Sequence, residues 1–183
     1  MNKLNSYLHK KRAEYIIDKV LPLINKNEKV LDIGSGSGHI GDKISKKANV
    51  QLLDIDNFNS TKLPLRIYDG KKIPFKDKSF DVGLILGVLH HCENQEEVIE
   101  EAKRVCKRLI IIENIFMNQI QRLVLCFFDS MFNLPAGIKV PFTFRRDGEW
   151  RQLFSEVGLK ISEEDEFRST MLIFKNKLYV LEE

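Results

Sequence analysis

Short apolar runs alternate with segments whose apolar residues recur every three or four positions between residues 29 and 113. The runs lie near residues 29–33, 50–53, 83–86 and 106–113. Short continuous runs are typical of buried strands, and spacings of three and four are typical of helices with one buried face. The alternation predicts an α/β fold with parallel strands joined by right-handed helical crossovers.

Apolar residues spaced three and four apart predict one helix before residue 29 and another that follows Asn94. An N-terminal helix is indicated by an apolar set that ends just before Pro22, namely Leu4, Leu8, Tyr15, Ile16, Val20 and Leu21. Asn94, followed by Glu97, resembles a capping box, and the buried face of the helix behind it would be Val98, Ile99, Ala102 and Val105.

The C-terminal part predicts one helix and two strands. Asp147 is expected to cap a helix that ends at Gly158 and turns Trp150, Leu153, Phe154 and Val157 inward. Two strands are expected near residues 159–162 and 170–174, and they would form a hairpin at the edge of the sheet.

Residues 115–141 form a segment that the alternating pattern does not explain. Its apolar residues fall at helical spacing and comprise Phe116, Ile120, Leu123, Val124, Phe127, Met131 and Leu134. An amphipathic helix follows from this spacing. Its apolar side either covers a substrate or packs on the core or on a second copy of the chain, and the pattern leaves these alternatives open.

A glycine-rich loop directly follows the first strand-like run. Gly34, Gly36 and Gly38 are spaced two apart, so the backbone is open to a ligand, and Ile40 and Ile44 then indicate a helix. About twenty residues further on, Asp54 ends the next run, where nucleotide-binding folds place an acid on ribose hydroxyls. The sequence predicts a nucleoside-like cofactor. Gly36, Gly38 and Gly41 also fit a dinucleotide fingerprint.

Composition narrows the class of protein. With 183 residues and 43% apolar content, the chain is expected to be a single domain, residues 1–183, with a full core. A net charge of +3, with acids and bases interleaved, makes a nucleic-acid partner unlikely. The N-terminus lacks a signal-peptide core, and no apolar run is long enough for a membrane span. Three scattered cysteines fit reduced thiols in the cytoplasm and predict no metal site.

The loop, read with Asp32 as D-x-G-x-G-x-G, resembles the first signature of class I S-adenosylmethionine-dependent methyltransferases. Three further segments resemble that family in the same order, namely residues 69–82, 83–91 and 100–105. The resemblance implies a Rossmann-like fold, with a mostly parallel seven-stranded sheet, an antiparallel last strand and helices on both faces. Residues 115–141 would be an inserted cover segment.

The resemblance also implies a cofactor site for S-adenosylmethionine, with S-adenosylhomocysteine as the product. Asp54 would bind the ribose hydroxyls and Asp69 the adenine amino group, whereas Asp32 would either face the ligand or orient the loop. The full set of implied cofactor-binding residues is Asp32, Gly34, Ser35, Gly36, Gly38, Asp54, Ile55, Asp69, Gly70, Leu86 and Gly87.

Two departures from the family pattern concern the connections of the sheet. The usual Lys-Pro-Gly-Gly turn before the fifth strand is missing, so the turn before residue 106 should be tighter. Residues 55–62 are too few for the usual helix between the second and third strands. One side of the sheet should therefore be thinly covered.

The catalytic candidates are His91 and His90, which follow the fourth strand-like run. Either imidazole could act as general base for an acceptor that is protonated at neutral pH. An Asn-Pro-Pro-Tyr type of motif is missing after this strand, which argues against adenine or glutamine acceptors. The cover segment, if it lines the acceptor cavity, favours a small, partly apolar molecule.

Other functions remain open on the sequence. A non-catalytic cofactor-binding or regulatory protein of the same fold, an RNA methyltransferase and a dinucleotide-dependent oxidoreductase are the alternatives to a small-molecule methyltransferase. A homodimer through the cover helix is the expected form of self-association.

Overall fold

A seven-stranded sheet forms the centre of the computed structural model, which describes residues 13–168 and 174–183. The strand order is β3-β2-β1-β4-β5-β7-β6, and β7 runs antiparallel to both of its neighbours. The strands are β1 Lys29–Ile33, β2 Asn49–Asp54, β3 Leu65–Ile67, β4 Phe80–Leu86, β5 Cys106–Ile115, β6 Lys160–Arg168 and β7 Lys175–Glu182. The expected mostly parallel sheet with an antiparallel last strand is confirmed.

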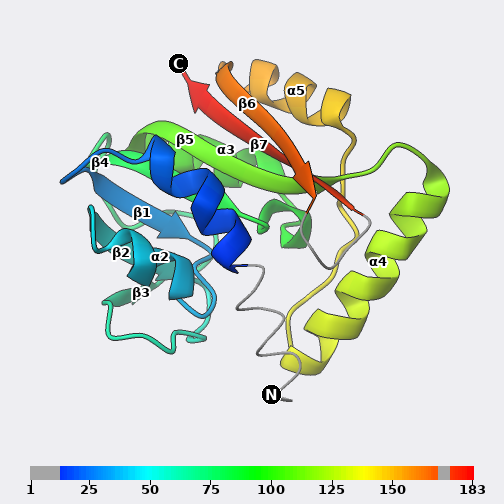
Figure 1. The fold of residues 1–183 in the computed structure, drawn as a ribbon, viewed down its shortest axis with the longest axis horizontal. Coiled ribbons are helices and arrows are strands. Elements are labelled where there is room, and N and C mark those ends of the chain that lie inside the picture. Colours follow the sequence, from blue (N-terminus) through cyan, green and yellow to red (C-terminus); the bar gives the residue numbers. More distant parts are fainter. Residues whose placement is uncertain (1–12, 169–173) are drawn as a thin grey trace.

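Helices cover both faces of this sheet (Figure 1). They are residues 13–20, α2 His39–Ile44, α3 Gln95–Val105, α4 Gln119–Asn133 and α5 Asp147–Glu156, with short 3-10 turns at Leu21–Leu23, Leu89–His91 and Leu134–Ala136. Residues 13–20 confirm the described part of the N-terminal helix, whereas Leu4 and Leu8 lie outside the described residues. None of the described helices is long and apolar enough to cross a membrane.

Two apolar cores lie on opposite faces of the sheet. Trp150, Phe154 and Tyr179 are fully buried in the core that α3 and α5 form with one face. On the other face, Ile16, Val20 and Ile44 pack against central strand residues such as Val82 and Ile110. The predicted inward faces of α3 and α5 are thus confirmed. Burying apolar surface on both faces is what holds a parallel sheet together.

The connections agree with the two departures noted in the sequence. α3 ends at Val105 and β5 begins at Cys106, so no residue of loop separates them. Residues 55–64, all of which are described, form no helix between β2 and β3. The Asn59 side chain instead organises this loop by binding the Leu63 carbonyl and the Thr61 N–H.

Two predicted helix caps are wrong. The Asn94 side chain makes no capping hydrogen bond among the described residues, although its position before α3 is correct. α5 begins at Asp147 itself, so its N-cap residue is Arg146. The Arg146 N–H donates to the Glu149 carboxylate at 2.6 Å. The Asp147 carboxylate does not cap the helix, because it accepts hydrogen bonds from the Arg151 guanidinium and the Tyr179 hydroxyl.

The tail forms an antiparallel hairpin of β6 and β7, as expected. The first expected strand, near residues 159–162, corresponds to the start of β6, which extends to Arg168. The second, near residues 170–174, falls almost entirely on residues 169–173, which lie outside the described part, and β7 begins at Lys175.

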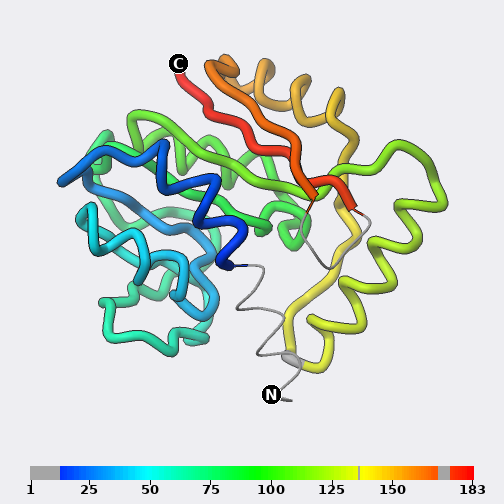
Figure 2. The backbone as a smooth tube through the Cα atoms, in the orientation of Figure 1, coloured from blue at the N-terminus to red at the C-terminus, as the bar shows by residue number. Residues whose placement is uncertain are grey.

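The predicted helix in the cover segment is confirmed as α4, which projects beyond the edge of the sheet (Figures 1 and 2). The predicted apolar side is largely exposed, so most of it does not pack on the core. Ile120 is 74% exposed, Leu123 70% and Phe127 64%, whereas Leu125 is buried. Leu125 packs in a small third cluster with Phe116, Phe144 and Phe174. Residues 135–146 run back along α4 toward α5 (Figure 2).

Candidate cofactor site and histidine cluster

The glycine loop leaves β1 at Ile33 and turns back on itself through three residues with positive φ. These are Gly34 (φ 70°), Gly36 (φ 51°) and Gly38 (φ 75°). A Cβ on Gly34 would lie 2.6 Å from the Val88 Cγ2 atom, so the close approach of the two segments requires glycine. In the part of the chain that the structure describes, no atom of another segment lies within 4 Å of where a Cβ of Gly36 would be. The loop is thus tightly packed at Gly34 and leaves open space beside Gly36.

Asp54 holds this loop from the end of the neighbouring strand. Its two carboxylate oxygens accept the N–H groups of Gly36 and Ile55, both at 2.7 Å. The side chain is buried, with 7% exposure. A carboxylate offers about four lone-pair sites, so it can accept further donors from a ligand.

Asp32 lies beneath the loop in the middle of the sheet, between Leu52 of β2 and Leu84 of β4. Burial and the negative charge of Asp54 raise its pKa to about 7, and the Gly41 N–H opposes this only partly. Its Oδ2 atom is buried and has no hydrogen-bond partner in the described part of the chain.

The Ser35 hydroxyl is a second buried polar group of the loop that lacks a partner among the described residues. Buried polar groups in proteins are normally hydrogen-bonded, to protein, water or ligand. Together with the open space at Gly36, these two unpartnered oxygens fit a ligand that carries hydroxyl and ammonium groups. The residues present therefore suit the expected S-adenosylmethionine.

Asp69 and Gly70 follow β3 on the same side of the loop. Asp69 is exposed, and its Oδ1 accepts the N–H groups of Lys71 and Lys72, which lowers its pKa. A Cβ on Gly70 would lie 3.2 Å from the Ile55 side chain, which is 59% exposed. Ile55 thus presents an apolar surface beside Asp69, as an adenine ring would require.

Leu86 and Gly87 end β4 beside the loop. Gly87 has φ 72°, and its N–H donates to the Ile112 carbonyl at 2.7 Å, which turns the chain away from the sheet. Because β1, β2, β3 and β4 are parallel, their carboxyl ends share one edge. The structure brings all the implied cofactor-binding residues to this edge, and their contact with a cofactor stays a prediction.

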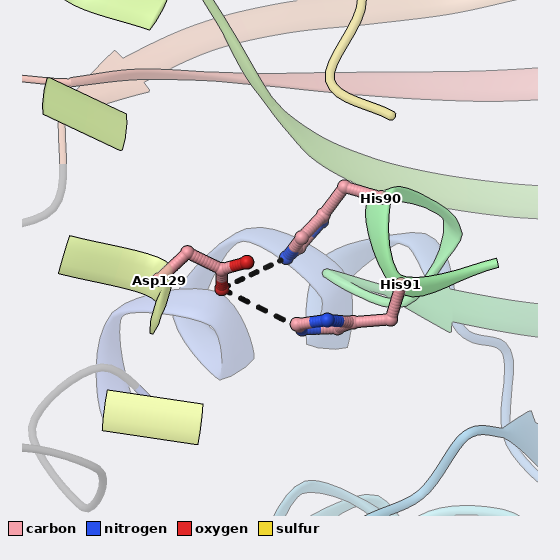
Figure 3. Close-up of side chains that lie close together, drawn as sticks. All are labelled: His90, His91 and Asp129. Carbon is pink, nitrogen blue, oxygen red and sulfur yellow. Dashed lines mark ion pairs between the residues drawn. The ribbon is translucent and has the colours of Figure 1, made fainter. Parts of the chain in front are cut away.

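His90 and His91 lie in the 3-10 turn after β4, and both rings point toward Asp129 of α4 (Figure 3). The Nε2 atoms of the two histidines lie 3.7 Å from Asp129 Oδ1. On the far side of His90, Nδ1 contacts Glu113 Oε2 at 2.6 Å. His91 Nδ1 lies 3.1 Å from the Lys139 carbonyl, which can only accept, so this nitrogen is the donor.

Burial and neighbouring charges shift the pKa values of His90, His91 and Asp129. Burial alone would lower the pKa of His90, but the charges of Glu113 and Asp129, together with the hydrogen bond to Glu113, raise it to about 9. Burial and the adjacent His90 lower the pKa of His91. Burial would raise the pKa of Asp129, but its contacts with the histidines lower it. Two adjacent histidines are thereby held in different electrostatic surroundings.

Glu113 and Asp129 are site residues that were not predicted from the sequence. Glu113 is fully buried, and its Oε1 accepts the N–H groups of Val88 and Leu89 at 2.9 and 2.7 Å. An acid that directly follows the run Ile110–Ile112 is a signal that could have identified it. Asp129 is the single acid within Gln119–Asn133, and this isolation on an otherwise apolar helix could have drawn notice.

Comparisons with known proteins agree with this architecture. A family described as a methyltransferase domain matches residues 31–110. An uncharacterized protein of Methanocaldococcus jannaschii is 38% identical over 80 residues, which are 43% of this chain and 39% of that protein. Demethylmenaquinone methyltransferase of Thermotoga maritima is 30% identical over 118 residues, which are 57% of this chain and 49% of that protein. The matches thus span less than half of each relative.

A solved structure shows the same fold over most of the chain. A SAM-dependent methyltransferase from Aquifex aeolicus aligns with a TM-score of 0.67 at 18% identity, covering 90% of this chain and 88% of that one. At this identity the likeness concerns the fold. The family match runs from within β1 to within β5.

Proposed function

We propose that the chain is a class I S-adenosylmethionine-dependent methyltransferase that methylates a small, partly apolar molecule, and the seven-stranded fold and the family match over residues 31–110 support this proposal. The observation that carries the proposal is the pairing of Asp54 with the open glycine loop. The Asp54 carboxylate fixes Gly36 at 2.7 Å and keeps lone pairs for a diol.

Each implied residue has a part in holding the cofactor. Gly34, Ser35, Gly36 and Gly38 line the loop, and Asp54 accepts the ribose hydroxyls. Ile55, Asp69 and Gly70 border the adenine. Asp32, Leu86 and Gly87 serve the amino-acid end, where a buried carboxylate can neutralise an ammonium group.

S-adenosylmethionine, when bound, supplies a methyl group on a positively charged sulfur that leaves as a neutral thioether. The chain then has to orient the acceptor in line with that methyl group and exclude water. Backbone groups at the carboxyl edge of β1, β2 and β4 fix the cofactor on a rigid sheet, and the histidine turn after β4 faces the acceptor.

His91 is the better candidate for a general base. Its Nδ1 donates to the Lys139 carbonyl, which leaves the Nε2 lone pair available, and 20% of its side chain is exposed. The His90 side chain is 3% exposed and lies between Glu113 and Asp129. His90 therefore serves to hold the turn, and His91 takes a proton from an acceptor that must lose one.

The surroundings of this turn support a partly apolar acceptor. Phe144 stacks on His90 with ring centroids 4.6 Å apart and belongs to the cluster of Phe116, Leu125 and Phe174. The Thermotoga maritima relative is named as acting on demethylmenaquinone, which is consistent with an apolar acceptor. A screen of candidate acceptors with labelled cofactor would identify the molecule.

The exposed side of α4 is also part of the proposal. Ile120, Leu123 and Phe127 either close over the acceptor or pack against a second copy of the chain, since both arrangements would bury apolar surface. Sedimentation with and without the acceptor distinguishes them, because only the second produces a dimer without it.

The wild-type protein is expected to bind S-adenosylmethionine in the micromolar range, and Asp54→Ala should bind it much more weakly. Loss of a charged acceptor costs about 1.5 to 3 kcal/mol, which corresponds to roughly a tenfold to 150-fold lower affinity. Calorimetric titration of both proteins measures the difference. The matched control is Asp56→Ala, which removes an exposed acid of the same loop.

Equal affinities of wild type and Asp54→Ala would remove Asp54 from the site. The oxidoreductase alternative is tested in parallel, because a ligand at a hundred times its dissociation constant adds about 2.7 kcal/mol to stability. Stabilisation by NAD but not by S-adenosylhomocysteine would favour the oxidoreductase. Cofactor binding without transfer to any acceptor would favour the regulatory alternative.

A further inference from the structure

We propose that His90, His91 and Asp129 form a binding site for a divalent transition-metal ion, with Zn²⁺ as the best match. One ligand atom from each of the three residues lies within 4.8 Å of the others. The two imidazole Nε2 atoms converge on one carboxylate (Figure 3). Two histidines and one acid, with a fourth position left for water or a ligand, is a donor set that zinc commonly uses.

The separations suit an ion between the three groups. The Nε2 atoms lie 3.7 Å from Asp129 Oδ1, which is too long for a direct hydrogen bond. Zinc bonds of about 2.0 to 2.2 Å place neighbouring tetrahedral ligands roughly 3.3 to 3.6 Å apart. Small rotations of the side chains would therefore bring all three onto one ion.

The surrounding hydrogen bonds already orient both imidazoles as metal ligands. Glu113 binds His90 at Nδ1, and the Lys139 carbonyl binds His91 at Nδ1, so Nε2 of each ring faces Asp129. Asn133 donates to Asp129 Oδ1 at 2.6 Å. Carboxylates, carbonyls and amides in these positions typically fix the orientation of ligating histidines and acids.

An unpartnered buried atom is independent evidence for a missing ligand. Asp129 Oδ2 is buried and lacks a hydrogen-bond partner in the described residues, while the whole side chain is 9% exposed. Leaving a charged oxygen without a partner is costly. A metal ion that binds both carboxylate oxygens of Asp129 would satisfy it, and the partly exposed His91 gives the ion a path from solvent.

The site would also tie α4 to the central sheet. Asp129 comes from α4, whereas the histidines come from the turn after β4 and Glu113 comes from β5. Bound zinc would therefore fix the cover helix against the carboxyl edge of the sheet. Zinc would use the same Nε2 lone pair that a base needs, so the two roles of His91 exclude one another at any moment.

The test is a titration of metal-stripped full-length protein with ZnCl₂, followed by calorimetry and by thermal unfolding. Wild type should bind one ion per chain and unfold at a higher temperature with zinc than without it. Asp129→Asn and His91→Gln should each weaken binding by more than about a hundredfold, and Glu113→Gln by about tenfold to a hundredfold. His39→Gln, which changes an exposed histidine elsewhere, should bind as wild type does.

Mg²⁺ serves as the metal control and should produce no such effect, because it prefers oxygen ligands in octahedral geometry. Absence of zinc binding by wild type, or equal binding by wild type and the folded ligand variants, would overturn the proposal. The cluster would then be a network of ion pairs alone. The titration needs neither S-adenosylmethionine nor an acceptor, so this inference does not depend on the proposed function.

Discussion

Gly34→Ala is expected to destabilise the protein by about 2 to 5 kcal/mol, the sum of two costs at one position. A φ of 70° costs a residue with a Cβ roughly 1 to 2 kcal/mol. The new methyl group would also lie 2.6 and 2.7 Å from the two Cγ atoms of Val88. Val88 cannot easily move, because its χ1 is stiff and its N–H is bound to Glu113.

Gly36→Ala is the matched control, since it lies in the same loop and also has a positive φ, of 51°. A Cβ there meets no atom of the described residues within 4 Å, so only the conformational cost of roughly 1 to 2 kcal/mol is expected. Urea unfolding of the three proteins gives the comparison. Equal losses for the two variants would show that the contact with Val88 relaxes freely. Gly36→Ala should nevertheless weaken cofactor binding, because its methyl group enters the open space.

Asp32→Asn is expected to stabilise the protein at pH 8 and to have little effect near pH 4. The folded-state pKa of Asp32 is raised from 3.8 to about 7. Between these values the folded protein holds a proton that the unfolded chain releases, so this group makes stability fall as pH rises from about 4 to about 7. The full penalty, on the order of 4 kcal/mol, is present above pH 7. The neutral amide of Asp32→Asn removes this penalty.

Urea unfolding of wild type and Asp32→Asn across this pH range measures the effect as a growing difference in stability. Asp56→Asn controls for the loss of one negative charge, because Asp56 is exposed. A gain that is the same at pH 4 and pH 8 would contradict the assignment. It would mean that the amide improves packing and that the charge of Asp32 is not the cause.

The convergence of the implied cofactor-binding residues at one sheet edge could be predicted from the sequence because its determinants are local. Gly34, Gly36 and Asp54 lie at the ends of two apolar runs, and parallel strands bring such ends to one edge whatever the remaining packing is. The hydrogen bond from Gly36 to Asp54 follows from that placement. The pKa of Asp32 could not be predicted in the same way, because the position of an acid in a strand does not reveal that its pKa is raised to about 7.

The orientation of α4 could not be predicted because the helix has apolar residues on more than one side. Leu125 and Phe128 pack inward, whereas Ile120, Leu123 and Phe127 stay exposed. The helical period identifies a stripe but does not say which stripe meets the protein. A polar contact sets the orientation of α4, because Asp129 on this helix turns toward His90 and His91. Such long-range pairs leave no periodic signal in a single sequence.

The direct junction of α3 and β5 at Val105 and Cys106 constrains how the chain can change over evolution. Deleting or inserting one residue there would turn the preceding helix by about 100° relative to the strand, or shift the strand by one position and reverse the faces of its side chains. Either change would expose Val98, Ile99 and Ala102 or the apolar face of β5. Substitutions can accumulate along residues 95–115, but the length of this stretch should stay fixed, and gene variants with single-codon insertions there should fail to yield folded protein.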